Sequence, residues 1–151
     1  AASALTAAVR LGASLVRVFV RDTAKTRALV DLAVRLGVTL EVHPLTELAG
    51  THHGFVLSTL PGGAADPLEF GPSGPDAVLF DVAYEPWPTV VASRWTDAGG
   101  RVLNGLDMLT EQAIGQIRFF LTGDEDELLP DEAGVRRAMR TAVDLPAVIG
   151  S

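Results

Sequence analysis

Apolar residues recur along this chain with two different spacings, which predict short strands alternating with longer helices. Continuous apolar or β-branched runs predict strands at residues 15–20, 38–42, 55–58, 77–80 and 101–103. Between these runs, apolar residues three and four positions apart predict helices. Gly37 and Gly99 follow two of the helical stretches, where glycine commonly ends a helix.

Local signals predict where the helices begin and which side of them is buried. The first helix extends from Ala1 to Leu11, the second is capped by Asp22 or Thr23, and the third has Pro88 in its first turn. The fourth follows Gly105. Its predicted core face consists of residues three and four apart: Leu106, Leu109, Ala113, Ile117 and Phe120. A last helix, including 135–142, follows the acidic run 124–127, which we interpret as a solvated linker.

This order of elements predicts the fold class. Strands of three to six residues that alternate with helices favour parallel β/α units. We therefore expect an α/β fold with a doubly wound parallel sheet and helices on both faces. In such a sheet, ligands lie outside the carboxyl ends of the strands, so the residues just after each strand are the candidate site.

Composition narrows the classes of function. The chain has 151 residues, 48% of them hydrophobic, which suits one domain with a substantial core. Its net charge of −7 disfavours nucleic acids and anionic membranes as partners, and no apolar run is long enough to span a membrane. The absence of cysteine excludes thiolate chemistry and fits a reducing cytoplasm. His43, His52 and His53 lie in or near predicted loops without a carboxylate partner at ligand spacing, so we expect no metal site.

Two cations follow the first strand. Arg21 and Lys25 stand where a dinucleotide fold meets the adenosine ribose, and two cations there suit the 2′-phosphate of NADP. Asp22 could instead bond the ribose hydroxyls of NAD, although it is also a helix cap. We therefore favour NADP and keep NAD open. The plainer interpretation is that both cations simply lie on the surface.

The other strand ends carry polar or small residues. Ser58 and Thr59 follow one strand, and backbone groups of that loop can meet the nicotinamide half of a dinucleotide. Tyr84, the only tyrosine in the chain, follows another. Gly105 lets backbone pass close to a ligand, and Gln112 offers a donor and an acceptor. The alternatives are a packed tyrosine, an ordinary turn glycine and a solvated glutamine.

Two segments resemble motifs of the shikimate dehydrogenase family. DVAYEPWPT, from Asp81 to Thr89, is similar to the pattern D-x-x-Y-x-P-x-x-T. NGLDMLTEQA, from Asn104 to Ala113, is similar to G-x-x-M-L-x-x-Q-A. Weaker similarities connect Arg21 and Lys25 with N-R-T-x-x-R/K, and residues 57–61 with I-N-A-T-S/P; Val20, Asp22 and Ser58 depart from these patterns. The resemblance covers almost the whole chain.

This resemblance implies a Rossmann-like fold and a function. The family transfers a hydride reversibly between NADPH and 3-dehydroshikimate to give shikimate, and the protein's task is to position the two. By resemblance, Arg21 and Lys25 hold the 2′-phosphate, and Val82 and Gly105 line the nicotinamide site. The full cofactor set is Arg21, Lys25, Ser58, Thr59, Val82, Gly105 and Met108. Tyr84 and Gln112 are expected to contact the substrate.

The family's catalytic Lys and Asp lie in an N-terminal substrate domain, and residues 1–151 have no counterpart of it. No catalytic residue is therefore assigned. We also expect the glycine-rich turn and the first strand of the sheet to lie upstream of Ala1. Residues 1–122 are thus predicted to form an N-terminally incomplete NADP-binding domain, followed by an acidic linker and a C-terminal helix over 123–151. This chain alone is expected to bind NADP weakly and to oxidise no shikimate.

Two other functions stay open. One is an NAD-dependent quinate/shikimate dehydrogenase, which Asp22 would suit. The other is a non-catalytic dinucleotide-binding regulatory module, against which Tyr84 and Gln112 argue, because a cofactor sensor needs no substrate-side groups. The partner in each enzyme is a small molecule, and a homodimer is kept open.

Overall fold

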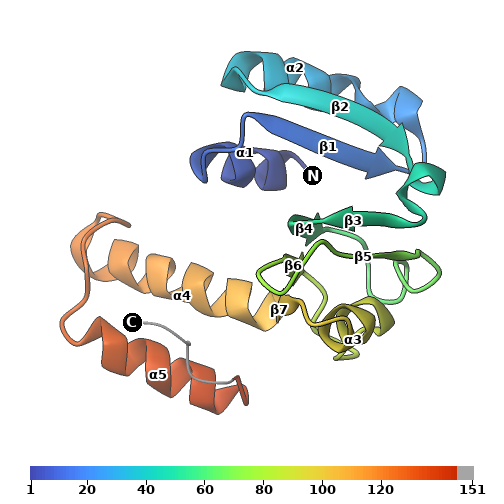
Figure 1. Ribbon diagram of the computed structural model, residues 1–151. Coiled ribbons are helices and arrows are strands. Elements are labelled where there is room, and N and C mark those ends of the chain that lie inside the picture. The colour runs from blue at the N-terminus through green and yellow to red at the C-terminus, as the bar shows by residue number, and fades with distance from the viewer. Residues whose placement is uncertain (146–151) are drawn as a thin grey trace.

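The computed structural model describes residues 1–145 and has parallel strands with helices packed around them (Figure 1). The strands are β1 (Leu15–Val20), β2 (Thr39–Pro44), β3 (Thr51–His53), β4 (Phe55–Ser58), β5 (Phe70–Pro72), β6 (Val78–Asp81) and β7 (Arg101–Leu103). The helices are α1 (Ala2–Arg10), α2 (Arg27–Leu36), α3 (Val90–Asp97), α4 (Gly105–Thr122) and α5 (Glu132–Ala142). Two short 3-10 helices, η1 (Thr23–Thr26) and η2 (Leu45–Leu48), complete them. The predicted α/β class is confirmed.

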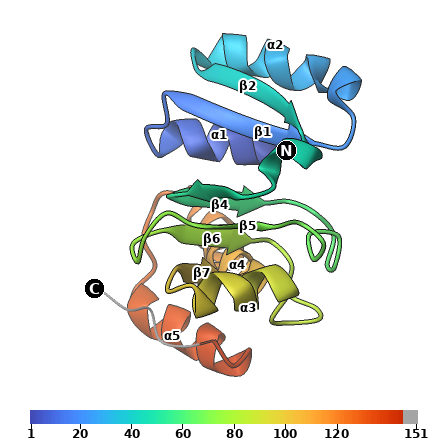
Figure 2. The same ribbon diagram turned by 45° about the vertical axis from the view of Figure 1, so that its right-hand side comes forward.

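The strands form three ribbons, all of them parallel. β1 pairs with β2, β4 and β7 pair with the two sides of β6, and β3 pairs with β5. Among the strands of residues 1–145, β1 and β4 each keep one edge without a partner. β1 and β4 lie on either side of the break between the upper and lower parts of the molecule (Figures 1 and 2). The break falls where a sheet lacking its first strand is expected to be open.

Each main ribbon has its own hydrophobic core. Leu5 of α1 and Ala33 of α2 are buried against Val16 and Val18 of β1. Trp95 of α3, 1% exposed, packs in the second core, and Leu79 at the centre of β6 is fully buried. Burying such side chains stabilises each by about 1.5–3 kcal/mol, so the helices are held to the strands by apolar contact.

Two helices begin later than the sequence predicted. Asp22 is a cap as expected, but its carboxylate accepts from the Ala24 N–H and caps the 3-10 helix η1, after which α2 begins at Arg27. Helix α3 begins at Val90, not at Pro88, because the Thr89 hydroxyl accepts from the Ala92 N–H and caps it. In both cases a side-chain hydrogen bond sets the start.

The predicted core face of α4 is wrong at Leu109 and Phe120, whereas Leu106, Ala113 and Ile117 are partly buried. Its buried residues are Gly105, Thr110 and Ile114, whereas Leu109 is 40% and Phe120 80% exposed. The helix runs away from the sheet, and its later turns lie beside α5 (Figures 1 and 2). Only the first turns of α4 therefore have a strand layer to pack against, and spacing along the helix could not reveal this.

The histidines lie in strands, contrary to expectation. His43 is in β2, and His52 and His53 are in the three-residue strand β3, which was not predicted. His43 also has a carboxylate partner, since its Nδ1 lies 2.8 Å from Glu47. Within residues 1–145, no group of three or more His, Asp or Glu side chains is placed to hold a metal ion. None of the helices in that range is both long and apolar enough to cross a membrane.

Candidate functional site

A cavity of about 580 Å³ lies between β1 and β4. Of the predicted site residues, Arg21, Ser58 and Thr59 line it. The start of α1 also borders it, through Ala1 and Ala4. Most of the remaining lining is apolar, from the two strands that lack a partner on this side. Arg21 and Thr59 follow the carboxyl ends of β1 and β4, Ser58 ends β4, and the N-terminus of α1 borders the cavity, so this end of the cavity suits an anionic ligand such as a dinucleotide.

The cations after β1 have different surroundings. Lys25 is 84% exposed and pairs with Asp22 at 3.3 Å, and it does not line the cavity. Arg21 is exposed, lines the cavity and makes no ion pair within residues 1–145. An exposed pair such as Lys25–Asp22 is worth only about 0–1 kcal/mol, so Lys25 can exchange it for a phosphate at little cost. Both cations are thus available to an anion.

Ser58 ends β4 with a buried hydroxyl. The residue is 8% exposed, and its Oγ has no hydrogen-bond partner in the described part of the chain. Its carbonyl accepts from the Val82 N–H at 3.1 Å, which joins the ends of β4 and β6. A buried polar group without a partner costs about 1–3 kcal/mol, so a polar group of a bound cofactor would relieve this cost. The residue fits a place in a cofactor site.

His53 also lines this cavity, although no pattern in the sequence indicated it. Its Nε2 lies 2.8 Å from the Thr51 hydroxyl, and its ring meets Phe19 edge-on at 5.9 Å between ring centres. Burial, reinforced by the positive charge of Arg17, lowers the pKa of His53 below its usual value of 6.5. The lowered pKa favours the neutral form of the imidazole.

Asp81 and Thr89 are the two ends of the first motif, and they meet inside the protein. Asp81 is 2% exposed, and its Oδ2 accepts from the Thr89 hydroxyl at 2.9 Å. Its Oδ1 accepts from the Ala83 N–H at 3.3 Å. This buried pair ties the end of β6 to the start of α3 and closes the loop that carries Tyr84. In this motif the carboxylate and hydroxyl are structural.

Gly105 is the point where the two motif segments meet. Its N–H donates to the Ala83 carbonyl at 3.1 Å. A Cβ at this position would collide with the carbonyl oxygen of Val82 and lie 2.9 Å from Tyr84 Cδ1. The close approach expected at Gly105 is therefore to the protein's own loop 82–84. Glycine is required because two stretches of backbone touch there.

A capping box, not recognised in the sequence, holds this turn. The Asn104 Oδ1 accepts from the Asp107 N–H at 3.0 Å, and the Asp107 Oδ2 accepts from the Asn104 N–H at 2.9 Å. Asn104 is 7% exposed. The spacing N-x-x-D ahead of an apolar helix is the signal that could have revealed it. The start of α4 is thus defined by two reciprocal hydrogen bonds.

The remaining predicted residues lie on the loop after β6 and on α4. Tyr84 is 48% exposed, and Met108 is half-buried one turn into α4. Gln112 is exposed and borders a second cavity of about 510 Å³. The other residues around that cavity are Gly115, Gln116, Phe119, Phe120 and Glu125. Val82, Tyr84, Gly105, Met108 and Gln112 do not line the first cavity. The structure therefore groups the predicted residues into two neighbouring sets, one between β1 and β4 and one around the start of α4.

Parallel strands, covering helices and a cavity at the strand ends define a Rossmann-like domain. No family model matches the chain. A curated NADP-dependent shikimate dehydrogenase of Rhizobium etli is 33% identical over 121 residues, which are 76% of this chain and 41% of that protein. The structure of shikimate dehydrogenase from Mycobacterium tuberculosis is 33% identical with a TM-score of 0.74, over 93% of this chain and 51% of that one. A shikimate 5-dehydrogenase from Mycobacterium fortuitum is 32% identical with a TM-score of 0.69, over 91% and 50%.

The resemblance to shikimate dehydrogenase is therefore confirmed over most of this chain. The chain spans about two fifths of the curated relative and about half of the two solved structures. A shikimate dehydrogenase in complex with NADP+ shares the fold at 16% identity, with a TM-score of 0.58.

Proposed function

We propose that this chain forms the cofactor-binding part of an NADP-dependent shikimate dehydrogenase. One observation supports this proposal above the others: the two motif segments that resemble the family's touch each other, through the Gly105 N–H and the Ala83 carbonyl at 3.1 Å. Tyr84 and the first turn of α4 are thereby held side by side at the strand ends. Two motifs read separately along the chain form one structural unit.

Each residue of the site has a proposed task. Arg21 and Lys25 bind the 2′-phosphate, and Ser58 and Thr59 bind the cofactor at the carboxyl end of β4. Val82, Gly105 and Met108 form the wall of the nicotinamide site. Tyr84 and Gln112 contact the substrate. When bound, NADPH supplies the hydride that reduces the carbonyl of 3-dehydroshikimate, and this chain's residues hold the two in place and exclude water.

We propose the same division of the chain as above, with the NADP-binding unit over 1–122 and an acidic linker and C-terminal helix over 123–151. The open edges of β1 and β4 suit one further parallel strand between them, which would fill the apolar part of the cavity and leave the residues that follow the strand ends to the cofactor. A strand there would satisfy the backbone groups of both edges. The turn between this strand and α1 would place a pyrophosphate at the N-terminus of α1, which borders the cavity.

Initial rates of the complete protein test this proposal. We expect 3-dehydroshikimate to be reduced with NADPH at least about tenfold more efficiently than with NADH, which corresponds to about 1.4 kcal/mol. Arg21→Gln should remove most of that preference and leave the rate with NADH unchanged. Arg35→Gln is a matched control, because Arg35 is an exposed cation on α2 that does not line the cavity.

Other outcomes would favour the alternatives. Equal efficiency with both cofactors would reject the NADP assignment and favour the NAD-dependent enzyme. Cofactor binding without turnover of shikimate or quinate would favour a regulatory module. The engagement of Asp22 in the cap of η1 and with Lys25 argues against its use as a ribose ligand.

A further inference from the structure

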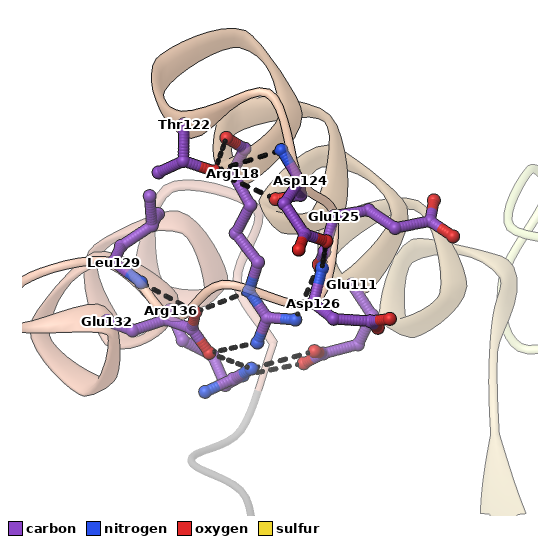
Figure 3. A network of polar contacts seen from close by, with 9 residues as sticks. All are labelled: Glu111, Arg118, Thr122, Asp124, Glu125, Asp126, Leu129, Glu132 and Arg136. Carbon is purple, nitrogen blue, oxygen red and sulfur yellow. Dashed lines mark hydrogen bonds and ion pairs between the residues drawn. The ribbon is translucent and has the colours of Figure 1, made fainter.

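Ion pairs connect α5 to α4 along the whole length of their contact. Glu132, Arg136 and Arg140 are spaced four apart on α5 and therefore share one face of that helix. Each meets an opposite charge on α4, and the pairs are Glu132–Arg118 at 2.6 Å, Arg136–Glu111 at 2.8 Å and Arg140–Asp107 at 2.8 Å. Figure 3 shows the first two pairs, with Arg136 also bonded to Glu132. We name these three pairs the α4–α5 ladder.

The Arg140–Asp107 pair is more buried than the neighbouring Arg136–Glu111 pair. The Arg140 and Asp107 side chains are 9% and 19% exposed, whereas those of Arg136 and Glu111 are 28% and 51% exposed. The Arg118–Glu132 pair at the other end of the ladder is buried to a similar extent as Arg140–Asp107, at 19% and 10%. A charge pair removed from water interacts more strongly, and losing one member leaves the other poorly solvated. The Arg140–Asp107 pair is thus more sensitive to substitution than the Arg136–Glu111 pair.

The same rung is connected to the proposed nicotinamide and substrate site. One carboxylate oxygen of Asp107 accepts from Arg140, and the other accepts from the Asn104 N–H at 2.9 Å. Asn104 immediately precedes Gly105, whose N–H bonds the Ala83 carbonyl. Arg140 therefore orients the Asp107 carboxylate. That carboxylate holds the turn before α4, and the loop that carries Tyr84 packs against this turn.

We propose that Arg140 is a positioning residue for hydride transfer: through Asp107 it holds the first turn of α4, and with it Gly105 and Gln112, in place beside cofactor and substrate. This inference rests on the proposed function. The guanidinium also neutralises a carboxylate near the place where an anionic substrate would bind, which reduces repulsion. In this proposal Arg140 touches neither substrate nor cofactor, and its effect on the site passes through Asp107.

The test uses the complete protein with Arg140→Gln, Asp107→Asn and Arg140→Lys. We expect kcat for shikimate oxidation to fall about tenfold or more in Arg140→Gln, because small misplacements of reacting groups are costly. Binding of adenosine 2′,5′-bisphosphate, which probes the other set of residues near Arg21, should stay unchanged. Arg140→Lys should recover part of kcat. Arg136→Gln is the control: it removes a neighbouring rung and lowers the unfolding temperature, but kcat should stay close to wild type.

A double variant separates positioning from general destabilisation. Arg140→Gln combined with Asp107→Asn should be no slower than either single variant, since both break the same contact. Additive losses, or an equal loss of kcat in Arg136→Gln, would overturn the inference. A wild-type protein that turns over no shikimate would reject the proposed function instead. In that case amide hydrogen exchange at residues 105–107 tests the role of Arg140. Faster exchange in Arg140→Gln than in Arg136→Gln supports the inference, and equal exchange in the two variants rejects it.

Discussion

Replacing Gly105 by alanine tests the packing at the centre of the candidate site. The added Cβ would collide with the Val82 carbonyl oxygen and lie 2.9 Å from both the Val82 carbonyl carbon and Tyr84 Cδ1. The ring of Tyr84 is half-exposed and can rotate away, but the Val82 backbone cannot, because its N–H is bonded to the Ser58 carbonyl. Overpacking of this kind costs about 1–3 kcal/mol, and a fixed backbone obstacle places it in the upper part of that range.

The effect can be measured by thermal unfolding with a control from the same helix. A loss of about 2–3 kcal/mol corresponds to roughly 4–12 °C in Tm for a domain of this size. Gly115→Ala adds the same methyl group to α4, but nothing lies within 4 Å of the new Cβ. That change should raise Tm, because alanine is favoured over glycine in a helix by about 0.5–1 kcal/mol.

Opposite shifts in the two variants are the expected result. Gly105→Ala should also lower kcat, since the displaced loop carries Tyr84. An unchanged Tm in Gly105→Ala would refute the reasoning, because it would mean that the loop 82–84 does not press on the start of α4. A matching loss in Gly115→Ala would refute it too, since the cost would then come from the helix and not from the contact.

Two further substitutions address buried and charged contacts. Thr89→Val keeps the side-chain shape but removes the α3 cap and the bond to Asp81, at an expected cost of about 2–4 kcal/mol by urea unfolding. Thr96→Val in the same helix should leave the free energy of unfolding nearly unchanged. Equal losses of stability in the two variants would contradict the role given to Thr89. The Arg118 guanidinium on α4 lowers the pKa of Glu132 from 4.5 to about 2. The contribution of ionised Glu132 to stability is therefore complete above pH 4.5 and is lost as the pH falls toward 2. Glu132→Gln should therefore be less stable than wild type near neutral pH and equally stable near pH 2. The control variant Glu127→Gln should show no such convergence with wild type. A stability difference between Glu132→Gln and wild type that stays constant with pH would refute this role of the Glu132 carboxylate.

Much of the fold could be predicted from the sequence because the signals are local. Apolar runs located β1, β4, β6 and β7 to within a residue or so, and their alternation with helices indicated parallel pairing. The three-residue strands β3 and β5 were missed. Strands that short carry no periodicity, and they exist only because each pairs with the other across 19 residues of chain, as in Thr51 opposite Phe70.

The candidate site was foreseen in part. Arg21, Ser58 and Thr59 line one cavity as their positions after strands suggested. Lys25 is exposed and paired with Asp22 and does not line this cavity, and Gln112 borders the second cavity instead. A strand end specifies which edge of the sheet a residue occupies, but side-chain direction depends on neighbours that are remote in sequence.

The sequence by itself determined the order of strands and helices, the glycine turn before α4 and the pair of motifs that resemble shikimate dehydrogenase. Only the tertiary structure decided which face of α4 is buried, since that depends on how far the sheet extends beneath the helix. Only the structure likewise revealed that Gly105 makes room for loop 82–84 and that Arg140 reaches Asp107 from a helix 33 positions further along the chain. Propensity and periodicity act between near neighbours, whereas these contacts join segments that are brought together only by burying apolar surface in a common core.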